Sequence, residues 1–148
     1  MSEVEKIISS LNKYPIKGKF KFRPDDLLSK VCNIPVKRDY NGIYLFYEMN
    51  SGALIYIGMS GRNTETGEII HRKDGLRGRF LTGTQFGERR SKSLPIQMRF
   101  EHISCLEIYW FVTYGDDSMD IPRPIEKLLI ETFKDENENR RPRWNKMD

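Results

Sequence analysis

The sequence contains few of the residues that carry several common kinds of chemistry. Its 148 residues include two cysteines, Cys32 and Cys105, and two histidines, His71 and His102. It has no Cys-x-x-Cys pair, no His-Glu-x-x-His motif and no phosphate-binding Gly-Lys-Ser/Thr loop. A zinc ribbon, a zinc protease and a nucleotide-binding P-loop are therefore excluded, and a protease triad lacks support. The two cysteines are expected to be free, buried thiols.

Long hydrophobic runs are also missing. No apolar segment approaches the ~20 residues that a membrane-spanning helix needs. The first residues, MSEVEKIISSLNKY, lack the basic and then apolar pattern of a secretory signal. At this length the chain is most simply one domain with one core. We expect a cytoplasmic protein.

Positive charge exceeds negative charge only slightly, with 25 Lys and Arg against 21 Asp and Glu. The basic residues are concentrated, however, in the segments HRKDGLRGR, GERRSK and NRRPRWNK. One such segment is usually a solvated surface, but three in a small domain favour a phosphate-bearing partner, here DNA. The candidate DNA contacts are Arg62, Arg72, Lys73, Arg77, Arg89, Arg90, Lys92, Arg141 and Arg143.

The hydrophobic pattern predicts an α/β (α+β) fold with a small central antiparallel sheet of three strands flanked by helices. Residues 42–49 and 53–59 are expected to form a hairpin across an Asn-Ser-Gly turn, and 105–114 a third strand. We expect residues 1–40 to be an N-terminal extension, with a half-exposed strand at 16–22, packed on a domain formed by 41–148. Helices are expected at 3–11, 23–32, 75–83, 93–103 and 121–136, and a small hairpin within 60–75.

Five short segments occur in the order typical of one enzyme family. They are Gly-Ile-Tyr at 42–44, Tyr-Ile-Gly at 56–58, LRGRF at 76–80, IEKLLI at 125–130 and RPRWN at 141–145. Together they resemble the motifs of the GIY-YIG endonucleases over roughly residues 41–145. The resemblance implies a metal-dependent DNA endonuclease that hydrolyses phosphodiester bonds with one Mg²⁺ or Mn²⁺ ion.

The resemblance also implies a role for each matched residue. Tyr44 and Tyr56 would face one cleft, with Tyr44 as the favoured base and Tyr56 orienting the water or the phosphate. Arg79 would stabilise the phenolate and hold the phosphate, and Glu126 would bind the metal. Asn145 would hold Glu126 or a tyrosine in place. For each residue ordinary packing or solvation is the alternative interpretation.

Some positions differ from the family pattern or have a simpler explanation. Gly42 and Gly58 are expected to allow close approach of a neighbouring backbone or of a phosphate. Gly83 stands where many members carry His or Tyr, four residues after the arginine, and His71 is an uncertain substitute. The loop between Tyr56 and Arg79 is longer than in compact repair members. These differences favour a restriction- or phage-like nuclease.

Two other functions remain open at this point. The chain could be a nucleic-acid-binding module that keeps the fold without cutting, or a partner-binding domain with a coincidental motif. For a nuclease with one active site, a double-strand break would need a homodimer or two sequential nicks. Trp144 is expected to anchor the C-terminal tail in the core.

Overall fold

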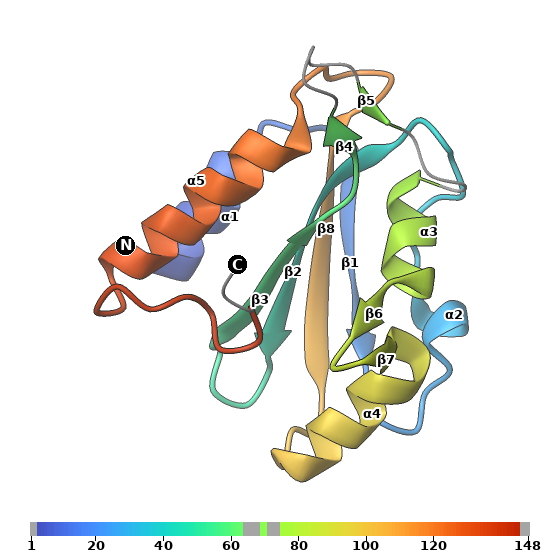
Figure 1. Cartoon of the computed structure of the whole chain (residues 1–148), viewed down its shortest axis with the longest axis vertical. Helices are drawn as coiled ribbons and strands as arrows, with labels where there is room; N and C mark the ends of the chain where they lie inside the picture. The colour runs from blue at the N-terminus through green and yellow to red at the C-terminus, as the bar shows by residue number, and fades with distance from the viewer. Residues whose placement is uncertain (1–2, 64–68, 71–74, 146–148) are drawn as a thin grey trace.

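The chain folds around an antiparallel sheet in which four strands lie in the order β1-β8-β2-β3 (Figure 1). The computed structural model describes residues 3–63, 69–70 and 75–145, with side chains for 5–61 and 75–145. The expected sheet had three strands, and the fourth is supplied by the N-terminal segment. The strands are β1 (Lys17–Phe22), β2 (Asn41–Glu48), β3 (Leu54–Met59) and β8 (Leu106–Tyr114).

Strand β2 lies inside the sheet and is covered on both faces. Residues 41–47 are all buried, which is typical of a strand with a layer packed on each side. Because side chains alternate along a strand, Ile43 and Leu45 belong to one hydrophobic cluster while Tyr44 and Phe46 belong to the other. The Gly-Ile-Tyr motif therefore lies at the centre of the fold.

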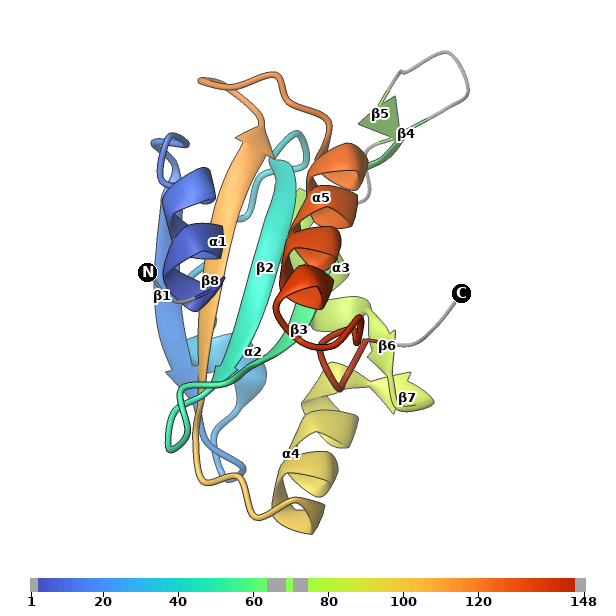
Figure 2. The ribbon, with the colours of Figure 1, turned by 90° about the vertical axis from the view of Figure 1, so that its left-hand side faces the viewer.

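Helices cover the two faces of the sheet in two separate layers (Figures 1 and 2). The cluster of Ile43 and Leu45 includes residues of α1 and α5, and the cluster of Tyr44 and Phe46 includes residues of α2, α3 and α4. None of the helices in the described part of the chain has the length and apolar character that a bilayer crossing requires. The helices are α1 (Glu3–Leu11), α2 (Leu28–Val31), α3 (Gly75–Thr82), α4 (Arg90–Phe100) and α5 (Pro122–Asp135).

Two short hairpins extend from this framework. The pair β4 (Arg62–Asn63) and β5 (Ile69–Ile70) is the small hairpin expected within the polar loop. The pair β6 (Thr84–Gln85) and β7 (Glu88–Arg89) was not expected. Helix α4 follows β7 directly, so it begins three residues earlier than predicted and contains Pro95.

The N-terminal segment is part of the sheet. Strand β1 pairs antiparallel with β8, with Phe20 opposite Ile108 and Phe22 opposite Leu106. The phenylalanines are buried while the intervening lysines are exposed, as the alternating sequence predicted. The free cysteines are both buried, which confirms the expectation for them.

Arg77 ties α3 to the segment around α2. Its Nη1 donates to the carbonyl oxygens of Cys32 (3.0 Å) and Ile34 (2.9 Å), and its Nη2 donates to that of Ser29 (3.1 Å). The sequence placed Arg77 among the DNA contacts. That assignment is corrected here, because the donors of its guanidinium are directed at backbone carbonyls within the fold.

Replacing Arg77 by Met should destabilise the protein while sparing its binding properties. Three backbone carbonyls would lose a charged donor, which is expected to lower the free energy of unfolding by roughly 1–3 kcal/mol. Urea denaturation measures the change. Arg38→Met, at an exposed arginine, is the control and should change stability little. Equal stability of the two variants would contradict the anchoring role of Arg77.

Candidate active site

The two motif tyrosines lie on one face of the β2–β3 hairpin. In the register of the pair, Tyr44 lies opposite Gly58 and Phe46 lies opposite Tyr56. Tyr44 and Tyr56 are thus diagonal neighbours, and their ring centroids are 6.1 Å apart. Both rings are directed to the side of the sheet that carries α3 and α4.

Gly58 makes this arrangement possible. A Cβ atom at position 58 would overlap the Tyr44 ring and lie 2.7 Å from Cε2 of Tyr56. A Cβ at Gly42 would overlap the carbonyl oxygen of Phe111, where the register of β2 with β8 shifts. Gly42 therefore allows close approach of a neighbouring backbone, as predicted, whereas the space at Gly58 is taken by the tyrosine rings and not by a backbone or a phosphate.

A buried arginine links the two phenols. Arg90 is 1% exposed, and its Nη2 donates to the hydroxyl oxygens of Tyr44 (3.1 Å) and Tyr56 (3.4 Å). The sequence placed Arg90 among the surface contacts to DNA. That assignment is wrong, because the guanidinium lies inside the protein. The role expected of Arg79, a cation next to the phenols, is filled by Arg90.

The rest of the Arg90 guanidinium is also hydrogen-bonded. Its Nε donates to Oε1 of Gln85 (2.9 Å), and its Nη1 donates to the carbonyl oxygens of Arg79 (3.1 Å) and Phe80 (3.0 Å). A guanidinium has five N–H donors, and here all five have an acceptor. Full pairing offsets much of the free energy that burying a charge requires. All five acceptors are oxygens of neutral groups. Of these groups, only the two tyrosine hydroxyls can lose a proton and become anions.

Gly83 leaves the space that the guanidinium fills. A Cβ at position 83 would overlap Nη1 of Arg90 and lie 2.5 Å from the carbonyl oxygen of Arg79. Two backbone hydrogen bonds fix this turn, from Gly83 N–H to Arg79 and from Arg90 N–H to the carbonyl of Gly83. Position 83, where many members of the family carry His or Tyr, is glycine in this chain, and the Arg90 guanidinium occupies the space beside it.

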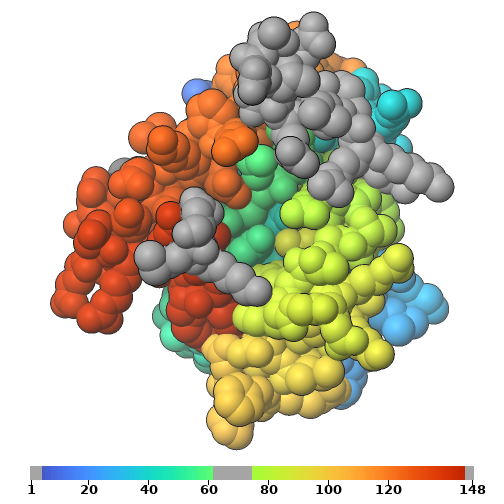
Figure 3. Space-filling model, in the orientation of Figure 1, coloured from blue at the N-terminus to red at the C-terminus, as the bar shows by residue number. Residues whose placement is uncertain are grey.

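Four of the predicted site residues meet in one small cavity. It has a volume of about 160 Å³ and is lined by Tyr44, Tyr56, Arg79 and Glu126 together with residues 59–61. Arg79 comes from α3 and Glu126 from α5, which belong to opposite layers. They reach the same cavity because β3 is an edge strand that both layers flank. Figure 3 shows β3 at the floor of a hollow between α5 and the segment of α3 and β6.

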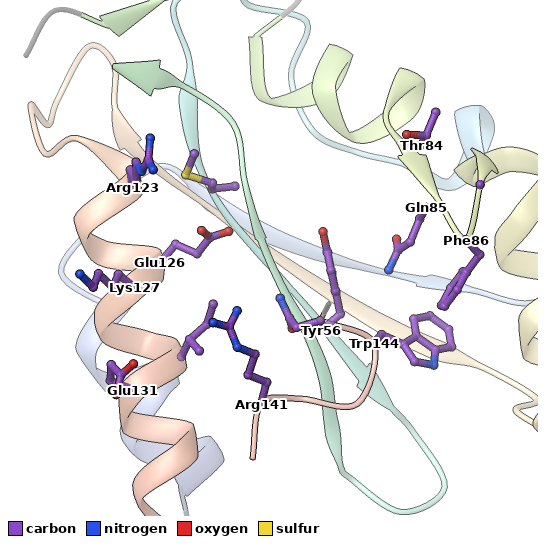
Figure 4. A pocket seen from close by; sticks show the side chains of 14 residues that line it. Tyr56, Thr84, Gln85, Phe86, Arg123, Glu126, Lys127, Glu131, Arg141 and Trp144 are labelled. Carbon is purple, nitrogen blue, oxygen red and sulfur yellow. The ribbon is translucent and has the colours of Figure 1, made fainter. Parts of the chain in front are cut away.

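A wider pocket of about 670 Å³ adjoins this cavity and shares Tyr56 and Glu126 with it. One wall is α5, with the side chains of Arg123 and Lys127, and the opposite wall is the β6–β7 hairpin (Figure 4). The sequence did not single out Arg123 or Lys127. Both are exposed, and their spacing of four residues places them on one face of α5 beside Glu126.

The environment of Tyr56 determines how readily its hydroxyl ionises. Burial raises the pKa of Tyr56, and the negative charges of an ionised Tyr44 and of Glu126 raise it further. Arg90 lowers the same pKa through its charge and its hydrogen bond. Burial alone would lower the pKa of Arg90, but the charges of the ionised phenols raise it, so Arg90 remains a cation. Arg90 therefore offsets only part of the effect of burial, and the pKa of Tyr56 remains above its ordinary value.

Asn145 acts on the backbone of β3. Its Oδ1 accepts from the N–H of Ile57 (2.9 Å) and its Nδ2 donates to the carbonyl of Ile57 (2.8 Å). The expected partner was Glu126 or a tyrosine, so this assignment is corrected. Together with the bond from Trp144 N–H to Ile55 (2.9 Å), these contacts cover the edge of β3 next to Tyr56.

Trp144 holds the tail against the core, as expected. The side chain is 4% exposed, and its Nε1 donates to Oε2 of Glu101 (2.8 Å). Arg143, a predicted DNA contact, is paired with Glu101 (2.8 Å) and Glu48 (3.6 Å). These partners give Arg143 a role in fixing the tail.

The other predicted basic contacts have varied positions. Arg89 is exposed, Lys92 is exposed and pairs with Glu88 (3.6 Å), and Arg141 lines the wide pocket. His71, Arg72, Lys73 and the side chain of Arg62 lie outside the described residues.

A single carboxylate is common to the two cavities. Within residues 3–63, 69–70 and 75–145, no group of three or more His, Cys, Asp or Glu side chains is arranged to hold a metal ion. Glu126 nevertheless fits Mg²⁺ or Mn²⁺, since such ions keep most of their water and take further oxygens from a phosphate substrate. A site of this kind would be complete only with substrate present.

Comparison with known proteins found no matching family model, no matching curated protein and no matching solved structure. Any functional assignment therefore rests on the residues and geometry of the chain.

Gly83→Ala should displace Arg90 and raise the pKa of Tyr56, because the methyl group needs the space that the guanidinium fills. Tyrosinate absorbance during alkaline titration measures this, with the Tyr56→Phe protein subtracted to isolate Tyr56. The contribution of Tyr56 should move to higher pH.

Gly52→Ala is the control. Gly52 has φ +72°, and apart from its chain neighbours no described residue has an atom within 4 Å of the place that a Cβ would take, so alanine there strains the backbone far from the site. It should lower stability by about 1 kcal/mol without moving the titration. An unshifted Tyr56 in Gly83→Ala would show that Arg90 does not control its ionisation.

Proposed function

We propose that the protein is a metal-dependent DNA endonuclease that hydrolyses phosphodiester bonds, related to the GIY-YIG enzymes. The observation that carries this function is the cavity lined by Tyr44, Tyr56, Arg79 and Glu126. These residues come from four different elements, β2, β3, α3 and α5, and each belongs to one of the motifs that resemble the family. A chance match of motifs gives no reason for the side chains to converge.

Phosphodiester hydrolysis requires a base for the attacking water and positive charge for the phosphate oxygens. Arg90 donates to each phenol oxygen, so the proton of either phenol points elsewhere and can be exchanged with a molecule in the cavity. Tyr44 is the proposed base, and Arg90 stabilises the phenolate that base catalysis needs. Tyr56 orients the water or the phosphate.

Arg79 and Glu126 would act on the phosphate from opposite sides. Arg79 carries a planar fork of donors suited to two phosphate oxygens. Glu126 would hold Mg²⁺ or Mn²⁺, which when bound supplies Lewis-acid stabilisation of the charge on the phosphate. Hydrolysis by these groups needs no covalent intermediate with the protein.

DNA would lie along the hollow between α5 and the β6–β7 hairpin. Arg123, Lys127 and Arg141 line the wide pocket and would contact phosphates on either side of the cut. With one such site per chain, double-strand cleavage would require a homodimer or two successive nicks. The long loop between Tyr56 and Arg79 favours a restriction- or phage-like enzyme, which would act in the cytoplasm.

Glu126→Gln should abolish cleavage and leave folding intact. The amide keeps the size of the side chain but removes the charge that holds the metal. Nicking of supercoiled plasmid with Mg²⁺, and with EDTA as a blank, measures the rate.

Glu131→Gln is the matched control, because Glu131 lines the wide pocket on the same helix but is absent from the small cavity. It should cut at a rate close to wild type. DNA binding without cleavage by the wild-type protein would point instead to a non-cutting module.

Tyr44→Phe and Tyr56→Phe should affect the rate far more than the fold. Each keeps the ring and deletes one hydroxyl, with a stability loss of roughly 0.5–1.5 kcal/mol. Loss of a positioned base lowers the rate by on the order of a hundredfold or more, so Tyr44→Phe should be almost inactive and Tyr56→Phe impaired but measurable.

Tyr109→Phe serves as the control. Its hydroxyl donates to Glu107 (2.8 Å) on the other face of the sheet, so its loss should leave cleavage unchanged. Normal cutting by both site variants would remove the tyrosines from the mechanism.

A further inference from the structure

The amide of Gln85 has an NH₂ group that is not hydrogen-bonded to any described residue. Gln85 is 8% exposed, and its Oε1 accepts from Nε of Arg90. Within the described part of the chain, its Nε2 is buried and has no hydrogen-bond partner. The residue lines the wide pocket, and Figure 4 shows the amide directed from β6 toward Tyr56. A buried donor without an acceptor destabilises a fold, so a bound acceptor would be favourable.

Arg90 fixes which end of the amide faces the pocket. A guanidinium nitrogen can only donate, so the amide oxygen must be the end that meets Arg90. Rotating the amide by half a turn would set two donors against each other. Gln85 therefore presents a donor, and only a donor, to whatever occupies the pocket.

The turn after Gln85 adds an aromatic surface. Phe86 and Gly87 both have positive φ, 56° and 88°, as in the two-residue turns that usually carry Asn-Gly. A phenylalanine in this conformation is strained, because its Cβ lies too close to the following carbonyl oxygen. Its ring packs edge-on against Trp144, with centroids 5.1 Å apart, and forms part of the pocket wall beside the amide.

These features match one unit of a nucleic acid. Aromatic walls and a single donor suit a base, and the cations Arg123 and Lys127 on the opposite wall suit its phosphates. The pocket volume of about 670 Å³ lies within the range typical of small-ligand sites. Gln85 is bonded to the same guanidinium as Tyr44 and Tyr56, so a base at Gln85 would adjoin the bond to be cut.

We propose that Gln85 selects the base next to the scissile phosphate by donating to its keto oxygen. Guanine and thymine present a keto oxygen on the major-groove edge, at the position where adenine and cytosine present an amino group. An amino group would face the Nε2 donor and leave both unpaired. This specificity rests on the proposed nuclease function.

The test is cleavage of a duplex library with randomised positions, in Mg²⁺, followed by sequencing of the cut ends. At one position adjoining the cut, wild-type protein should favour guanine or thymine over adenine or cytosine by about tenfold, the value of one hydrogen bond of 1.4 kcal/mol. Gln85→Met removes the donor at similar length and should abolish the preference at that position.

Two further variants separate recognition from structure. Gln85→Glu keeps an acceptor for Arg90 but presents an acceptor to the pocket, so its preference should move toward adenine or cytosine. Thr84→Ala alters the neighbouring exposed residue of β6 and should keep the wild-type preference. The preference, unlike the overall rate, would not respond to a general loss of packing.

The outcomes distinguish the specificity from the nuclease function. If wild-type protein cuts with equal use of the four bases at every position, or if Gln85→Met keeps the wild-type preference, the base contact is overturned and the nuclease stands. A uniform fall in the rate with the base preference retained in Gln85→Met would assign the amide to holding Arg90, from which its Oε1 accepts, and would also overturn the base contact.

If wild-type protein does not cut, the nuclease function fails. Binding of fluorescent duplexes that differ only at the randomised position, measured in Ca²⁺, then decides the base contact separately. Stronger binding of keto than of amino bases by wild type, lost in Gln85→Met, would support it, and equal or undetectable binding would overturn it.

Discussion

The buried guanidinium of Arg90 is the interaction on which the site depends. Its five donors connect α4 to β2, β3, α3 and β6, so the relative positions of these elements are fixed by one planar group. A buried charge tolerates few alternatives, because moving any acceptor leaves a donor unpaired in the interior. The same group that orders the framework also sets the charge around the two tyrosines.

Space limits the site as strictly as charge does. Gly58 gives the Tyr44 ring room to lie beside Tyr56, and Gly83 gives the guanidinium room to reach them. Neither glycine carries a Cβ, which at Gly58 would overlap the Tyr44 ring and at Gly83 would overlap the Arg90 guanidinium. At the edge of the sheet, β3 then allows residues from the two helical layers to reach one cavity, which an interior strand could not do.

Patterns in the sequence predicted the hairpin that carries Tyr44 and Tyr56, the strand at 106–114 and the amphipathic helix α5, because each is a local regularity. They did not predict that Arg90 is buried. Arg90 follows the exposed Arg89 in a basic segment, and only its hydrogen bonds to residues distant in the sequence distinguish it from Arg89. The β6–β7 hairpin was missed because its strands are two residues long and its turn carries phenylalanine instead of asparagine. The predicted partner of Asn145 was wrong for a similar reason. Its true partner is the backbone of Ile57, and every residue type offers the same backbone groups, so the sequence does not indicate which one is bound.

The strand order has a further consequence for how the chain reaches this structure. The hairpin β2–β3 pairs residues that are close in the sequence, whereas β1 belongs to the sheet only through its pairing with β8, the last strand. Pairing of the first strand with the last requires closure of a long loop, which slows folding. The tyrosines are therefore brought together by a local pairing, whereas Arg90 contacts them across 46 and 34 residues of sequence. An edge of the hairpin that has not yet paired with β8 or with the C-terminal tail is a place at which chains can associate with one another.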